Sequence, residues 1–110
     1  MIQTTIYRTE SGRVRSFTIT GHALFANHGN DIVCAGASAV SFGAVNSIIA
    51  LTGVEPEIEQ KADGFLRCDF PDNLPEDVQE KVQLLLEGMI VSLQTIERDY
   101  GKHIKITFKK

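Results

Sequence analysis

The sequence predicts an α+β fold, a two-layer sandwich in which a sheet of about five strands carries two main helices on one face. Three patterns support this prediction. Several short segments alternate apolar and polar residues, as half-buried strands do. One segment rich in small residues follows an acidic cap, and a later, longer segment repeats apolar residues every three or four positions, as helices do. The expected order is β-β-α-β-β-α-β, within a single domain covering residues 1–110.

An N-terminal hairpin is expected first. Residues 1–8 alternate in the period of a half-buried strand, and residues 13–20 are rich in β-branched and aromatic side chains. Glu10, Ser11 and Gly12 between them have the chemistry of a turn. This hairpin delivers the chain to Gly21 and His22.

The first helix is expected from Ile32 to about Thr52. Asp31 is a good N-cap because its carboxylate can accept backbone N–H groups two or three residues further on, and this makes Cys34 the third helical residue. Gly53 is a plausible terminator. In residues 23–30, before the cap, apolar residues follow neither the strand nor the helix spacing, so a loop is expected there. Small and apolar residues at helical spacing are expected to face the core: Ala37, Val40, Ala44, Ser47, Ile48 and Leu51.

A second hairpin should follow this helix. Residues 54–60 alternate glutamates with apolar residues, and Pro56 places them at a sheet edge or a strand start. Asp63 and Gly64 form a hairpin turn before a strand over residues 65–70. Cys68 shares one side of that strand with two apolar neighbours, which favours a buried core thiol.

The strongest helical pattern begins with a cap at Asn73 and ends at Gly101. Apolar residues spaced by three or four define its core face: Val78, Val82, Leu85, Met89, Leu93, Ile96 and Tyr100. This face is widened by three further apolar residues, Leu86, Ile90 and Val91. Part of the face is therefore available to a second subunit. Residues 104–108 then alternate as a last strand.

Composition excludes some classes of function. With 11 basic and 14 acidic side chains, the net charge of −3 gives no electrostatic reason to bind nucleic acid. We expect no membrane association, because no run reaches the ~18 uninterrupted apolar residues of a membrane span and the N-terminus lacks a signal-peptide pattern. A cytoplasmic protein with reduced thiols is therefore expected. Cys34 and Cys68 lack paired spacing, so no structural disulfide is expected.

The residues with chemical potential gather between Gly21 and Ser38. Only a thiolate attacks a carbonyl, and an ordinary thiol is mostly protonated at neutral pH. The N-terminus of a helix carries about half a positive charge and a nearby imidazolium adds a whole one, so both favour the thiolate. Cys34 in the first helical turn and His22 across the loop can thus form a Cys–His dyad for acyl transfer. The N–H groups of that turn, including that of Cys34, are candidates for holding the oxyanion.

Other roles for these residues remain open. Asp31 either orients His22 or only caps the helix, and Ser38, one turn after Cys34, either bonds the sulfur or fills a small-residue interface. Cys34 is also compatible with a small buried hydrophobe, and His22 with a loop residue bonded to backbone. His28 competes as the base but stands among Asn and Gly residues. A zinc site from His22, His28 and Cys34 would lack the paired spacing of zinc motifs, so no metal or other cofactor is expected.

The segments GHA and GNDIVCAGASAVSFGAVNSI, which begin at Gly21 and Gly29, resemble the ribosomal-processing cysteine proteases of Firmicutes and related bacteria, the Prp family. The resemblance extends over the whole chain, including MIVSLQTIERDY in the last helix. It implies a cysteine endopeptidase that removes a short N-terminal extension from large-subunit ribosomal protein number twenty-seven, cutting after an aromatic residue and before a small one. It further implies that His22 and Cys34 are the catalytic pair.

The same resemblance implies supporting roles for Asp31 and Ser38, a homodimer, and a mobile loop over the site. The expected partners are the ribosomal protein precursor and a second copy of the chain. The rival classes are a non-catalytic ribosome-associated binding module, which would not need both His22 and Cys34, and a metal-binding domain, which would also need His28.

Overall fold

Strands and helices follow one another in the predicted order β-β-α-β-β-α-β in the computed structural model, which describes residues 1–22, 26, 31–62 and 64–110. The helices are α1 (Ile32–Thr52) and α2 (Glu76–Tyr100). The strands are β1 (Ile2–Arg8), β2 (Val14–Thr20), β3 (Glu57–Lys61), β4 (Phe65–Asp69) and β5 (Ile104–Lys109). The predicted α+β class is confirmed.

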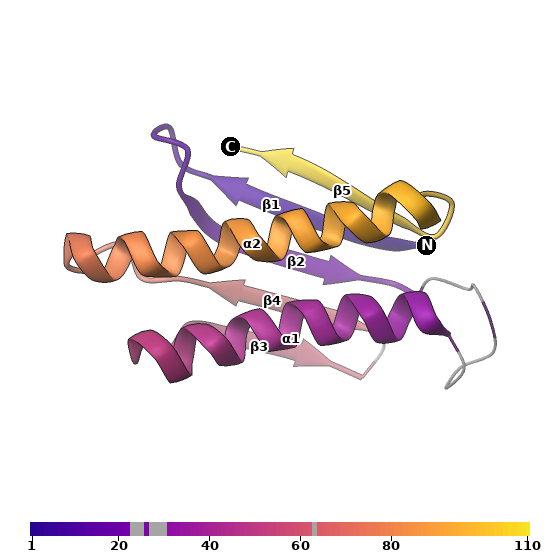
Figure 1. The fold of residues 1–110 in the computed structure, drawn as a ribbon, viewed down its shortest axis with the longest axis horizontal. Helices are drawn as coiled ribbons and strands as arrows, with labels where there is room; N and C mark the ends of the chain where they lie inside the picture. Colours follow the sequence, from indigo (N-terminus) through magenta and orange to yellow (C-terminus); the bar gives the residue numbers. More distant parts are fainter. Residues whose placement is uncertain (23–25, 27–30, 63) are drawn as a thin grey trace.

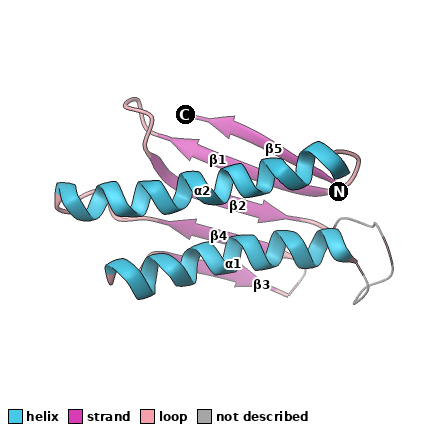
Figure 2. Ribbon diagram, viewed as in Figure 1, coloured by secondary structure: helices cyan, strands magenta, loops and turns pink. Residues whose placement is uncertain are grey.

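The strands form one mixed sheet in the order β3-β4-β2-β1-β5. The predicted hairpin of β1 and β2 and the antiparallel pair of β3 and β4 are both present, and β2 also pairs antiparallel with β4. The last strand, β5, lies parallel to β1, and α2 makes the connection that a parallel neighbour requires. Both helices lie side by side over the same face of the sheet, as predicted (Figures 1 and 2).

The core lies between that sheet face and the helices. Ile6 and Phe17 are opposite one another on β1 and β2, and both are fully buried. Leu86 and Leu93 of α2 and Ile48 of α1 are buried against the same cluster. Full burial of each such side chain contributes about 1.5–3 kcal/mol, so this layer holds the helices in place over the sheet.

The ends of α1 are those that the sequence predicts. Oδ1 of Asp31 accepts the backbone N–H groups of Val33 and Cys34, each over 3.0 Å. At the other end, Gly53 has a φ of +75° and its N–H donates to the carbonyl of Ile49 over 3.0 Å. The cap at Asp31 therefore places Cys34 in the first turn of the helix.

The buried face of α1 differs from the predicted one. It consists of Val33, Ala37, Ser41, Val45 and Ile48. The expected Val40 and Ala44 are only half-buried, and Leu51 is 71% exposed. Ser41 can be buried because its hydroxyl donates to the carbonyl of Ala37 over 2.7 Å.

By length and composition alone, α1 is long and apolar enough to cross a membrane. Core helices of soluble proteins can have the same length and composition. In the structure α1 packs beside α2 (Figure 1).

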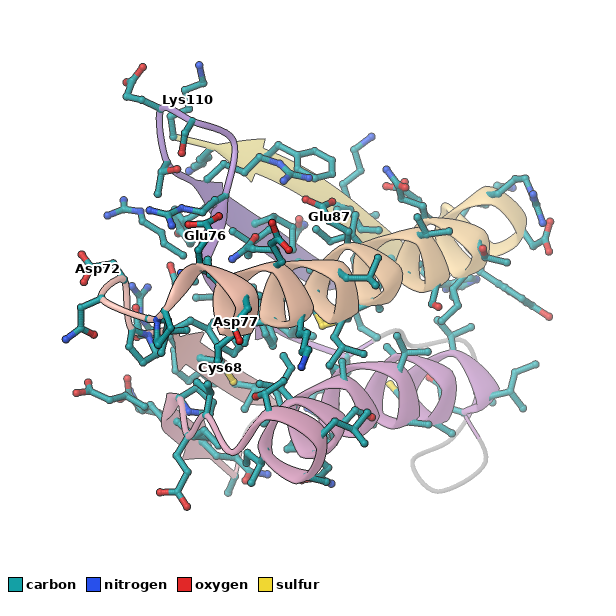
Figure 3. The ribbon with its side chains drawn as sticks, turned by 60° about the vertical axis from the view of Figure 1, so that its left-hand side comes forward. Cys68, Asp72, Glu76, Asp77, Glu87 and Lys110 are labelled. Carbon is teal, nitrogen blue, oxygen red and sulfur yellow. The ribbon has the colours of Figure 1, made fainter. Side chains whose placement is uncertain are left out.

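The start of α2 corrects the predicted cap. The helix begins at Glu76 with Pro75, not Asn73, at the N-cap, and no cap hydrogen bond from a described side chain satisfies its first N–H groups. A proline disfavours helical backbone at the residue before it, which excludes Leu74 from the helix, and Pro75 itself has the extended ψ of 146°. The acidic Glu76 and Asp77 instead place negative charge at the positive end of the helix dipole (Figure 3).

The third strand is also shorter at its start than predicted. It begins at Glu57, directly after Pro56, which has no N–H to donate to a ladder. As the proline suggested, β3 is an edge strand. The predicted loop over 23–30 lies outside the described residues except for Ala26.

Candidate active site

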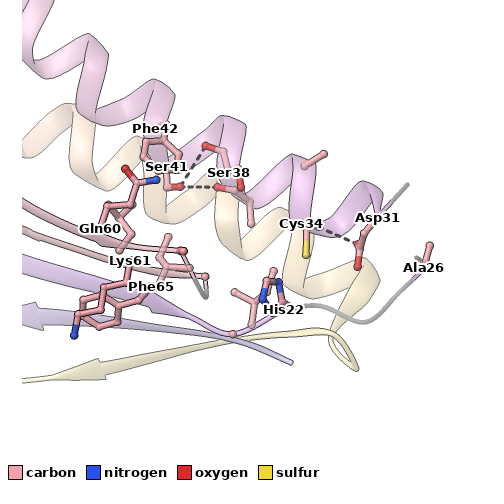
Figure 4. A pocket seen from close by; sticks show the side chains of 18 residues that line it. His22, Ala26, Asp31, Cys34, Ser38, Ser41, Phe42, Gln60, Lys61 and Phe65 are labelled. Atoms are coloured by element: carbon pink, nitrogen blue, oxygen red, sulfur yellow. Dashed lines mark hydrogen bonds between the residues drawn. The ribbon is translucent and has the colours of Figure 1, made fainter. Parts of the chain in front are cut away.

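A cavity of about 630 Å³ opens where the start of α1 passes over the end of β2 and the β3–β4 hairpin (Figure 4). All the site residues that the sequence predicts line this cavity: His22, Asp31, Cys34 and Ser38. Residues from separate segments of the chain therefore meet in one hollow, which is the arrangement that a two-residue chemistry needs.

Cys34 lies at the α1 side of this cavity. It is half-buried, and its sulfur points into the hollow toward the side where the His22 ring lies (Figure 4). The first turn of a helix is a favourable place for a thiolate because the peptide dipoles point their positive end at it. The two cysteines, both within the described residues, are not joined in a disulfide.

His22 reaches the cavity from the end of β2. The preceding Gly21 has a φ of +89°, and a Cβ there would lie 2.5 Å from the carbonyl oxygen of Met1. A glycine is therefore required at this bend. The N–H of Gly21 donates to the carbonyl of Gly64 over 2.9 Å, so the backbone before His22 is fixed to the β3–β4 turn.

Asp31 and Ser38 both line the cavity, but they differ in burial and in their hydrogen bonds. Asp31 is buried and caps α1, as its two hydrogen bonds to Val33 and Cys34 show. Ser38 is exposed one turn after Cys34, and its carbonyl accepts the hydroxyl of Ser41 over 3.3 Å.

The cap changes the expectation for the oxyanion donors. The N–H of Cys34 already donates to the Asp31 carboxylate, and that of Ala35 donates to the Asp31 carbonyl, each over 3.0 Å. Because these donors are engaged, the predicted use of the Cys34 N–H as an oxyanion donor is not supported by the structure.

The part of the cavity away from Cys34 is largely apolar. It is lined by side chains that the sequence did not single out, chief among them Ile19, Phe42 and Phe65, with Gln60 at the edge (Figure 4). These residues come from β2, α1, β4 and β3, and only the sheet order brings them together, so no local pattern could have identified them. A hollow with this lining suits an apolar side chain of a ligand.

Cys68 does not line this cavity. Cys68 is fully buried in β4, as predicted, and burial foremost, with the charge of Asp69 second, raises the pKa of its thiol to about 11. A thiol in such surroundings is inert. His28, which the zinc alternative requires, lies outside the described residues.

Comparison with known proteins points to one family. Residues 1–105 match the model of the family described as cysteine protease Prp. The ribosomal processing cysteine protease Prp of Bacillus subtilis is 52% identical over 108 residues, which cover 97% of this chain and 96% of the relative. That of Staphylococcus aureus is 41% identical over 109 residues, covering 99% and 100% of the two chains.

Solved structures agree with this result. The crystal structure of an essential ribosomal processing protease Prp from S. aureus, in complex with a covalently linked product peptide, superposes with a TM-score of 0.91 at 41% identity. A second structure of the S. aureus protein, in complex with a substrate peptide, has a TM-score of 0.85 at 40% identity. Each alignment covers 99% of this chain and 100% of the other.

Proposed function

The chain belongs to the Prp family of cysteine proteases, and from this premise we propose that Cys34 is its nucleophile and His22 the acid–base partner. The observation that carries the proposal is that both side chains face one cavity, the thiol from the first turn of α1 and the imidazole from the end of β2 (Figure 4). Structures of the S. aureus relative in complex with a substrate peptide and with a covalently linked product peptide support a peptide as the substrate.

The reaction proceeds in two steps on these groups. The Cys34 thiolate attacks the peptide carbonyl carbon and forms a thioester, while protonated His22 donates its proton to the departing amine. Neutral His22 then takes a proton from water, and the resulting hydroxide attacks the thioester carbonyl and expels the Cys34 thiolate. The carboxylic acid formed in this step loses its proton to solvent and leaves as the carboxylate. The thiolate and the protonated imidazole are restored at the end.

The substrate that we propose is the N-terminal extension of large-subunit ribosomal protein number twenty-seven, cut between an aromatic and a small residue. Relatives at 52% and 41% identity carry the name ribosomal processing protease, which supports a substrate of this class. The apolar part of the cavity around Phe42 and Phe65 has the character that an aromatic side chain requires.

Cleavage of a synthetic peptide spanning that extension tests the dyad. Cys34→Ala and His22→Ala are each expected to lower kcat by about a thousandfold or more, because each removes a group on which both steps depend. Cys68→Ala serves as the control, since its thiol lies outside the cavity, and should keep most of the activity. A Cys34→Ala protein with full activity contradicts the proposal.

A non-catalytic ribosome-associated binding module is the alternative that the same experiment addresses. Such a module would bind the peptide and leave it intact, and its binding would tolerate both substitutions. Binding of the peptide by both variants, with cleavage only by the unaltered protein, separates the protease from the module.

We also propose that the protein acts as a cytoplasmic homodimer that binds neither nucleic acid nor membrane, with ribosome biogenesis as its setting. The outer face of α2 carries Leu84 and Val91, which are 74% and 61% exposed, and a second subunit would cover such apolar surface. Of the three residues expected to widen this face, Leu86 and Ile90 are instead buried in the core.

A further inference from the structure

Gly64, in the turn between β3 and β4, lies directly against the ring of His22. A Cβ atom at Gly64 would lie 3.2 Å from both Cε1 and Nε2 of the imidazole. The same atom would lie 2.8 Å from the carbonyl oxygen of Gly21, whose N–H donates to the Gly64 carbonyl. The place of the missing side chain is therefore taken by the histidine ring and by the backbone that leads into it.

We propose that Gly64 is a positioning residue for His22, because the absence of its side chain creates the flat seat on which the imidazole lies while it faces Cys34. The inference rests on the proposed dyad and names what holds its base. His22 is exposed to solvent, so its orientation needs a rigid neighbour on the cavity side. Acid–base groups must be held within about 0.5 Å of their productive position.

A turn alone could also require a glycine here. Gly64 has a φ of +77°, a backbone conformation that side chains other than glycine rarely adopt. Gly12 and Gly53 have similar φ angles of +90° and +75°, yet a Cβ at either would meet no described atom within 4 Å. Substitutions at these two glycines thus reproduce the backbone strain without any contact on His22.

Asparagine is the suitable replacement, because among residues with a side chain it adopts a positive φ comparatively easily. Gly64→Asn keeps the turn accessible but puts a Cβ where the ring lies. Gly12→Asn and Gly53→Asn are its matched controls, one in the turn between β1 and β2 and the other at the end of α1.

The first measurement uses the unaltered protein. Nuclear Overhauser contacts should connect the α-protons of Gly64 with the Cε1 proton of His22, because one α-proton points along the direction in which a Cβ would lie 3.2 Å from Cε1. The His22 resonances should move in Gly64→Asn and stay in place in both controls. Absence of the contact in the folded, unaltered protein overturns the proposal, even where Gly64→Asn does not fold.

The second measurement is kinetic. A displacement of about 1 Å costs about a hundredfold in rate, so Gly64→Asn should lower kcat by that factor while the two controls keep the unaltered value. Because Gly64 also lines the cavity, an inserted side chain could instead obstruct the peptide, and that would raise KM. Alkylation of Cys34 by iodoacetamide at neutral pH distinguishes the two effects, since this reagent is too small to need the peptide site.

Alkylation of Cys34 should be slowed in Gly64→Asn as much as in His22→Ala, and no further in the double variant, because both changes act through the same ring. Normal alkylation in a folded Gly64→Asn protein with raised KM means obstruction alone and overturns the inference. If His22→Ala cleaves normally, the proposed dyad itself is wrong. If His22→Ala is inactive and Gly64→Asn cleaves normally, only the inference about Gly64 fails.

Discussion

Asp31 shows how one side chain can fix the turn that carries Cys34. Its carboxylate accepts two backbone N–H groups of α1, and its own carbonyl accepts a third. These bonds hold the turn that carries Cys34 in a single conformation. The sequence allowed Asp31 either to orient His22 or to cap the helix, and the structure establishes the cap.

Replacing Asp31 should destabilise the whole protein. Asp31→Ala leaves two N–H groups at the start of α1 without their acceptor, which costs about 2 kcal/mol of unfolding free energy. Asp31→Asn keeps an acceptor oxygen and should lose less than half of that. Urea unfolding measures both, with the exposed Asp72→Ala as a control expected to stay within about 0.5 kcal/mol. Equal stability of Asp31→Ala and Asp72→Ala would exclude the cap as a source of stability.

Cys68 provides a pH-dependent contribution to stability. Burial raises the pKa of its thiol from 9.0 to about 11, so the folded protein holds this proton more tightly than the unfolded chain does. The resulting stabilisation is complete below pH 9.0 and is lost as the pH rises toward about 11. Urea unfolding across this window should show a steeper decline for the unaltered protein than for Cys68→Ala. Parallel declines would show that Cys68 does not titrate differently in the two states.

At the scale of elements, α2 is fastened to the sheet by polar contacts at one end of the β1–β2 hairpin. Gln83 accepts the N–H of Val14 over 2.8 Å and donates to its carbonyl over 2.9 Å, beside the irregularity where Arg8 pairs with Val14. The side chain thus pairs with the strand where the ladder is disturbed. Arg8 also forms a two-pronged ion pair with Glu87 of α2, and this hydrogen bonding lowers the pKa of the Glu87 carboxyl (Figure 3).

Loss of the Gln83 side chain should loosen α2 from β2. Gln83→Ala leaves the N–H and the carbonyl of the buried Val14 without these partners, at a cost of about 2 kcal/mol in unfolding free energy. Gln83→Glu can accept but cannot donate, and should be destabilised as well. Gln94→Ala, at an exposed position of the same helix, is the matched control and should change stability by less than about 0.5 kcal/mol. If chemical denaturation gives Gln83→Ala and Gln94→Ala the same unfolding free energy, Gln83 does not have this role.

Boundaries of elements were predicted well where a local cap exists and poorly near prolines. Asp31 and Gly53 define α1 because each bonds its own helix end. The predicted starts of β3 and α2 were both too early, at Val54 and Asn73, because the restrictions of Pro56 and Pro75 outweighed the apolar pattern and the capping residue.

At the scale of the whole molecule, the sequence predicted the fold class and the residues of the proposed dyad, but not the hollow around them. Periodicity identifies strands and helices, and the motif around Cys34 is local. The neighbours of each strand are not local, so nothing in the sequence placed β4 beside β2 or β5 parallel to β1. Phe42 and Phe65 share a cavity only because of that order. Gly64 was predicted as a turn residue, and its contact with His22 became visible only in three dimensions.

The first residues of the chain border the candidate active site. The Met1 carbonyl lies against Gly21, and Ile2 lines the cavity, whereas β5 carries the C-terminus to the far end of the sheet (Figure 1). A purification tag fused before Met1 would therefore leave the molecule beside the proposed nucleophile, where it could occupy the cavity or be cut. A tag fused after Lys110 would leave from the opposite end. The C-terminus is the end to choose for immobilisation, labelling or fusion to a reporter.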